Sequence, residues 1–103
     1  MSRPFSYNDE NFTVIGNILF VHFKCAGDAP VGSRLIEIPP AISDRLLFYT
    51  SFCFVAYDIK NTNSHSIVLT VIDYGGKSYL SNKLDLEASS ARYICGFFFL
   101  KDI

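Results

Sequence analysis

The stretch from Phe12 to Lys24 constrains the fold more than any other, because it has the pattern of a tight β-hairpin. Two apolar segments, residues 12–15 and 18–25, flank the dipeptide Gly16-Asn17. Glycine adopts positive φ without steric cost, and asparagine tolerates the left-handed region better than most residues. A two-residue loop of this kind between strand-like segments predicts a hairpin.

Alternation along the second segment of this hairpin separates a core face from an outer face. Successive side chains of a strand point to opposite sides, so Leu19, Val21 and Phe23 share the face predicted to lie in the core. Phe20 lies on the other face, beside the polar His22 and Lys24, where the core of this chain would not cover its ring. We therefore expect the outer face to pack against another chain.

The rest of the chain is predicted to form strands separated by turns, and no segment favours a long helix. Further strands are predicted at 34–38, 46–57 (with a bend at 50–51), 65–72, 78–80 and 91–100. Loops are predicted at 26–33, 58–64, 73–77 and 82–90, with a turn of helix or a loop at 42–45 and a helical turn at 84–88. Residues 1–10 are predicted to be an N-terminal arm or linker, and residues 11–103 one β domain. This spacing indicates an all-β, antiparallel β-sandwich, jelly roll or small barrel of about seven or eight strands.

Composition limits the partners of this domain. Of the 103 residues, 50% are hydrophobic and only 18% are charged, and ten Phe and six Tyr exceed what so small a core holds. We expect part of this aromatic surface to be covered by another subunit or used for binding. The net charge of −1 without a basic stripe argues against nucleic acid, and no apolar run reaches the roughly 18 residues of a membrane span. The N-terminus lacks the apolar core of a secretion signal, so synthesis in a reducing cytoplasm is expected.

The cysteines and histidines do not predict a metal or nucleophile site. Cys25, Cys53 and Cys95 are far apart and form no CxxC pair, and each lies in an apolar segment, where a thiol acts as a small hydrophobe. His22 and His65 lack a third ligand at metal spacing. No cofactor is predicted.

Three loop aspartates are candidates for catalytic carboxylates. Asp58, Asp73 and Asp85 are of the type that commonly caps turns, and nothing singles out two of them for acid–base chemistry. A non-enzymatic protein is therefore expected, and a small hydrolase of wall polysaccharide stays as an alternative.

Two polar loops combine aromatic and hydrogen-bonding side chains in the way that saccharide sites do. An aromatic face stacks on the C–H surface of a sugar, while amides, carboxylates and imidazoles bond its hydroxyls. The predicted ligand-binding residues of the first loop are Tyr57, Asp58, Asn61, Asn63 and His65. Tyr74 and Lys77 form a second set on the turn that follows.

Three motifs in this order resemble the head (receptor-binding) domain of phage tail fibres and baseplate proteins, notably of phages that infect Gram-positive bacteria. They are the Gly-Asn hairpin of residues 12–21, the short strand Ile36-Glu37-Ile38-Pro39, and the strand and glycine turn of residues 68–77 that precede a strand containing Tyr93. The family often continues Pro-x-Gly-Tyr/Phe-x-Pro at the second motif, whereas this chain reads Pro39-Pro40-Ala41-Ile42-Ser43, which leaves the shape of that connection open.

This resemblance implies a function that composition and spacing alone do not give. It implies a homotrimeric β head at the tail tip of a virion, assembled in the cytoplasm of the host bacterium with other tail or baseplate proteins. The head would bind a host cell-surface saccharide through loops or intersubunit grooves, without inserting into the membrane. A purely structural or trimerisation module of a virion remains a second alternative.

Overall fold

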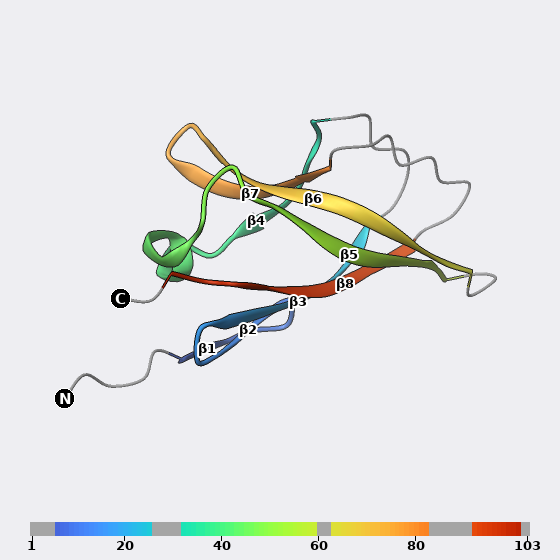
Figure 1. Ribbon diagram of the computed structural model, residues 1–103, viewed down its shortest axis with the longest axis horizontal. Helices are drawn as coiled ribbons and strands as arrows, with labels where there is room; N and C mark the ends of the chain where they lie inside the picture. Colours follow the sequence, from blue (N-terminus) through green and yellow to red (C-terminus); the bar gives the residue numbers. More distant parts are fainter. Residues whose placement is uncertain (1–5, 26–31, 60–62, 83–91, 102–103) are drawn as a thin grey trace.

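In the part of the chain that the structure describes, eight antiparallel strands form one sheet that curls into a half-barrel (Figure 1). The computed structural model describes residues 6–25, 32–59, 63–82 and 92–101. The strands and one 3-10 helix are β1 (Ser6–Asn8), β2 (Phe12–Ile15), β3 (Ile18–Cys25), β4 (Arg34–Ile38), η1 (Pro40–Arg45), β5 (Ser51–Asp58), β6 (Ser64–Tyr74), β7 (Lys77–Asn82) and β8 (Arg92–Phe99).

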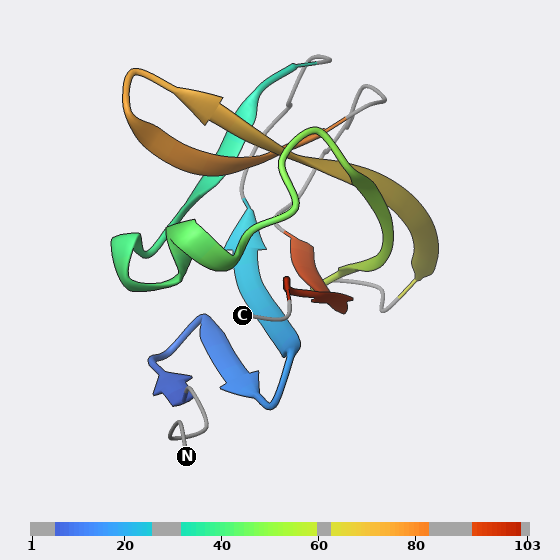
Figure 2. The ribbon, with the colours of Figure 1, turned by 60° about the vertical axis from the view of Figure 1, so that its left-hand side comes forward.

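The order of strands across the sheet is β1-β2-β3-β8-β5-β6-β7-β4. The hairpin-connected strands β5, β6 and β7 with β8 beside β5 make a Greek key. Figure 2 shows β1 and β2 at one end of the curl, and the other end is formed by β4 beside the β6–β7 hairpin. The prediction of an antiparallel all-β domain is confirmed, in the form of a single curled sheet.

The predicted Gly-Asn hairpin is confirmed with its predicted bounds. β2 and β3 pair from Phe12 opposite Val21 to Ile15 opposite Ile18, and Gly16 has φ +64°. In this first turn Asn17 does not have positive φ, whereas in the second turn both Gly75 and Gly76 do, at +59° and +81°. This turn joins β6 and β7, both of which extend beyond the strands predicted at 65–72 and 78–80.

The core fills the inner face of the curl. Leu19, Val21 and Phe23 are at most 3% exposed, as alternation predicted, while Phe20 on the outer face is 41% exposed. The inner faces of β5 and β8 supply an aromatic cluster, in which the Phe98 ring lies 4.8 Å from that of Phe52 and 6.1 Å from that of Phe54.

The segment before β5 differs from the prediction. The long strand predicted from 46 to 57 begins only at Ser51, because Leu46 is buried against the core and the chain then turns through Tyr49, which has φ +61°. The Tyr49 amide donates to the Val71 carbonyl at 2.6 Å, and the Val71 amide donates to the Thr50 carbonyl at 3.1 Å. Tertiary hydrogen bonding thus overrides the apolar pattern here.

Two shorter segments contain elements that the sequence did not fully predict. The polar stretch predicted as an arm contains β1, a three-residue edge strand paired with β2, in which Ser6 and Asn8 are exposed and Tyr7 packs against the core. Residues 42–45, predicted as a turn of helix or a loop, belong to η1. The helical turn predicted at 84–88 lies outside the described residues.

Candidate functional site

A strip of aromatic rings crosses the outer face of the sheet on β3, β8 and β5. The Phe97 ring centroid lies 5.8 Å from that of Phe20 and 6.4 Å from that of Phe99. Farther along β8, the Tyr93 ring stacks on His22 at 5.0 Å with an interplanar angle of 12°. The ring of Tyr57, a predicted site residue, follows at 5.4 Å from Tyr93.

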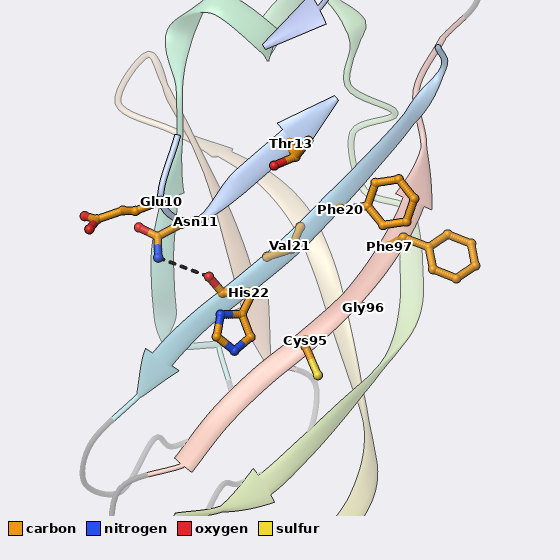
Figure 3. A pocket seen from close by; sticks show the side chains of 9 residues that line it. All are labelled: Glu10, Asn11, Thr13, Phe20, Val21, His22, Cys95, Gly96 and Phe97. Carbon is orange, nitrogen blue, oxygen red and sulfur yellow. Dashed lines mark hydrogen bonds between the residues drawn. The ribbon is translucent and has the colours of Figure 1, made fainter. Parts of the chain in front are cut away.

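Beside these rings the outer face is hollowed (Figure 3). The hollow has a volume of about 300 Å³ and is lined by Glu10, Asn11, Thr13, Phe20, Val21, His22, Cys95, Gly96 and Phe97. In Figure 3 the Phe20 and Phe97 rings lie together on one side, and the His22 imidazole lies on the other side with the Asn11 amide next to it. Apolar ring surface and hydrogen-bonding groups thus meet in one open depression.

The turn between β1 and β2 fixes the polar rim of this hollow. The Oδ1 atom of Asp9 accepts from the backbone amides of Asn11 and Phe12, each at 2.8 Å, and its Oδ2 accepts from the Tyr7 hydroxyl at 2.8 Å. The Asn11 side-chain amide then donates to the His22 carbonyl at 3.0 Å, and the His22 amide donates to the Asn11 carbonyl at 2.9 Å. The rim is therefore tied to β3 before any ligand arrives.

The same hydrogen bonds set the charge of the turn. Desolvation tends to raise the pKa of Asp9, but the hydrogen bonds from Asn11, Tyr7 and Phe12 together outweigh it and lower the pKa below its ordinary value. The bond to Asp9 raises the pKa of Tyr7, since it stabilises the protonated phenol. Asp9 is thus an anion at neutral pH that holds the turn in place.

The residues predicted on the first polar loop lie at one end of the β5–β6 hairpin, as far as the described residues go. Tyr57 and Asp58 end β5, Asn63 precedes β6, and the Asp58 amide donates to the Asn63 carbonyl at 2.9 Å. His65 lies opposite the buried Ala56, so alternation puts it on the inner-face side of β6, away from Tyr57 on the outer face. Asn61 lies outside the described residues.

The second predicted set lies far from the first, at the other end of the strand predicted between the two turns. Tyr74 and Lys77 face each other across the Gly75-Gly76 turn, at the far end of β6 from His65. Nine residues of strand at about 3.3 Å each put roughly 30 Å between His65 and Tyr74. The structure therefore gives two separate polar clusters.

The far cluster also contains side chains that the sequence did not single out. The Arg34 guanidinium carbon lies 4.0 Å from the Tyr74 ring centroid and 5.5 Å from that of Tyr79. The Lys77 ammonium lies 3.9 Å from a Glu37 carboxylate oxygen. A second, smaller hollow of about 240 Å³ adjoins them, lined by Glu37, Ile38, Pro40, Ser43, Gly76, Lys77 and Ser78.

Two of the three candidate catalytic carboxylates, Asp58 and Asp73, lie far apart in the sheet. Asp58 is bonded to Asn63 at the start of β6, and Asp73 lies near the end of the same strand. Ten residues at about 3.3 Å put them roughly 30 Å apart, whereas glycosidase carboxyl pairs are about 5–9.5 Å apart. Asp58 and Asp73 therefore do not form such a pair, and Asp85 lies outside the described residues.

The cysteines of the described chain are free, and they belong to no cluster of metal ligands. Cys25, Cys53 and Cys95 are free thiols, and Cys53 is exposed rather than packed as a core hydrophobe. Among residues 6–25, 32–59, 63–82 and 92–101, no group of three His, Cys, Asp or Glu side chains could hold a metal ion. The same ranges contain no helix with the length and apolarity that crossing a bilayer requires.

Comparison with known families, curated proteins and solved structures gives no match.

Sequence reasoning missed part of the hollow, namely Glu10, Asn11 and Phe97. A signal for Phe97 was present, because alternation in Phe97-Phe98-Phe99 sends only the middle ring inward. The Asp9-Glu10-Asn11 run had the composition of a side-chain-capped turn, but its packing against β3 depends on the pairing of β2 with β3.

Proposed function

We propose that this chain is a non-enzymatic saccharide-binding domain, acting as the head of a phage tail tip that recognises a host cell-surface saccharide. The observation that carries this proposal is the hollow in which Phe20 and Phe97 adjoin the His22 imidazole and the amide of Asn11. Exposed rings offer a stacking surface for sugar C–H groups, and the polar rim offers partners for hydroxyls. The resemblance of the hairpin and glycine-turn motifs to tail-tip heads supplies the biological setting.

The preorganised rim supports this proposal. Ordering flexible side chains lowers affinity, so a site whose polar groups are already held by hydrogen bonds binds more tightly. The Asn11 side-chain amide is held in this way by the His22 backbone carbonyl, while the His22 imidazole is held by stacking on the Tyr93 ring. The Tyr57–Tyr93–His22 rings extend the stacking surface from the hollow toward the first polar loop, which would let more than one sugar unit lie along the strip.

The proposal is tested by binding of the purified protein to a glycan array and to host cells. Replacing Phe97 by Ala should abolish most of the array signal, because it removes one ring wall of the hollow. The matched control is Tyr49→Asn, which removes an exposed ring that does not line the hollow and should leave the signal unchanged. Parent-like binding by the Phe97→Ala variant, with its fold confirmed by circular dichroism, would overturn the proposal.

Self-association as a homotrimer is part of the same proposal, and a second patch supports it. Ile15, Ile18 and Phe99 lie opposite one another on β2, β3 and β8, and Ile15 and Phe99 are 64% and 51% exposed. These residues adjoin the hollow, with the Phe99 ring 6.4 Å from that of Phe97, but they do not line it. A stable interface needs about 800 Å² per partner, so this patch would form its centre.

The trimerisation module without a ligand is the second candidate function. It uses the same apolar patch but predicts that the hollow binds nothing. Array and cell-binding signals that are absent for the trimeric parent protein would favour this module over the saccharide-binding head.

A further inference from the structure

The outer face of β4, β6 and β7 holds a cation between two tyrosines. The guanidinium carbon of Arg34 lies 4.0 Å from the ring centroid of Tyr74 and 5.5 Å from that of Tyr79. One cation–π pair is ordinary, since about one occurs per 70–80 residues. A guanidinium held against two rings has fewer conformations to lose when it binds a partner, and this is the first reason to suspect a site.

A second reason is that the charge of Arg34 is not offset. Within the described ranges, no carboxylate makes an ion pair with Arg34. The nearby Glu37 instead pairs with Lys77, at 3.9 Å, and both of these side chains are well exposed. Such a pair is weak, so this end of the sheet presents a guanidinium and a loosely held ammonium to solvent.

A third reason is that a backbone irregularity puts Arg34 on this face. Ile36 lies opposite Leu80, but Arg34 lies opposite Ser81, so Leu35 is an extra residue in β4. Without this bulge, alternation would put Arg34 on the inner face with Ile36 and Ile38. Bulges commonly re-aim a side chain in this way.

We propose that Arg34, held by Tyr74 and Tyr79, binds an oxyanion: a phosphate, a phosphodiester or a carboxylate group. The planar guanidinium offers two parallel N–H donors to two oxygens of such a group. Lys77, directly opposite Tyr74 across the hairpin, adds a second positive charge. This site goes beyond the proposed saccharide function, because the hollow beside Phe97 lies on other strands.

The experiment is a titration of the intact chain, followed by amide NMR shifts at constant ionic strength. The probes are inorganic phosphate, glycerol phosphate and glucuronate. Saturable shifts around Arg34 are expected, and the tighter of the last two probes identifies a phosphate or a carboxylate ligand. Arg34→Gln should weaken binding by roughly tenfold or more, as expected for loss of a charged hydrogen bond.

Three further variants make the result specific. Arg34→Lys should recover only part of the affinity, because an ammonium keeps the charge but not the planar pair of donors. Tyr74→Leu should weaken binding, because it removes the ring nearest to the guanidinium. Lys24→Gln, which removes an exposed lysine elsewhere on the outer face, should have no effect.

Two outcomes would overturn the proposal. The first is the absence of saturable shifts around Arg34 in the parent protein, and the second is equal weakening by Arg34→Gln and Lys24→Gln, which would indicate general charge attraction. Phe97→Ala should leave the phosphate titration unchanged. Failure of the anion site is therefore distinguishable from failure of saccharide binding.

Discussion

The ring of Phe54 occupies the space in which residue 96 would carry a side chain. A Cβ atom added to Gly96 would lie 2.8 Å from Cδ2 of Phe54 and 3.1 Å from its Cγ. Gly96 lies opposite Val21 in the pairing of β8 with β3, and Phe54 is 2% exposed. The missing side chain therefore lets a buried ring fill the inner face of the central strands.

Replacing Gly96 by Ala should destabilise the domain by about 1–3 kcal/mol, because a methyl group would overpack a filled core. Denaturant unfolding measures this loss. In Gly96→Ala/Phe54→Leu the smaller side chain makes room for the methyl group, so the double variant should lose less stability than the two single losses summed. Additive losses would show that the contact between residues 54 and 96 does not cause the effect.

Tyr49 has φ +61°, a conformation that costs a residue with a side chain about 1–2 kcal/mol. Its ring is 72% exposed, so little packing would be lost on replacement. We expect Tyr49→Asn to raise the unfolding free energy by up to about 1 kcal/mol, since Asn tolerates this region. Tyr49→Val should lower it, and a thermal melt that ranks the two variants in the opposite order would contradict this account.

Asp9 should make the stability of the domain depend on acid pH. Its pKa is lower in the folded chain than the ordinary 3.8, so its contribution is complete above that value. The contribution is lost as the pH falls through the folded pKa. Asp9→Asn should remove this part of the acid dependence. Urea unfolding tests this when the free energy of unfolding is measured from pH 6 down to the pH at which the protein denatures in acid. An acid dependence as steep in Asp9→Asn as in the parent would count against the role of the carboxylate.

The apolar patch should control self-association. Phe99→Ser removes a ring that is half exposed on the outer face without touching the inner core. Sedimentation should show a homotrimer for the parent chain and a shift toward the monomer for Phe99→Ser. Tyr49→Asn, which also removes an exposed ring, is the matched control. A parent chain that sediments as a monomer would contradict the assembly proposal.

The sequence predicted where individual strands and turns lie. It did not predict which strands, distant in the sequence, become neighbours in the sheet. The Gly16-Asn17 hairpin and the inward face of β3 follow from steric preferences and alternation, which are local properties. The hollow could not be predicted, because it forms where Asn11 of one hairpin meets Phe97 of a strand more than eighty residues later. That meeting depends on β8 pairing with β3.

The sequence also did not predict the β-bulge in β4, where one extra residue changes the register of the strand. The extra residue Leu35 moves Arg34 to the outer face, and no turn signal in the sequence marks this bulge. The separation of Tyr74 from His65, by contrast, follows from the strand predicted between their two turns, which β6 continues to Tyr74.

The central place of β8 has a consequence for how the molecule is made. β8 hydrogen-bonds to β3 on one side and to β5 on the other, yet it follows every strand that it joins. On a ribosome, the hairpin unit β1–β3 and the unit β4–β7 are both synthesised while the strand that bridges them is still missing. Sheet closure must wait for residues 92–99, which favours slow folding and leaves the edges of β3 and β5 open to wrong partners in the meantime.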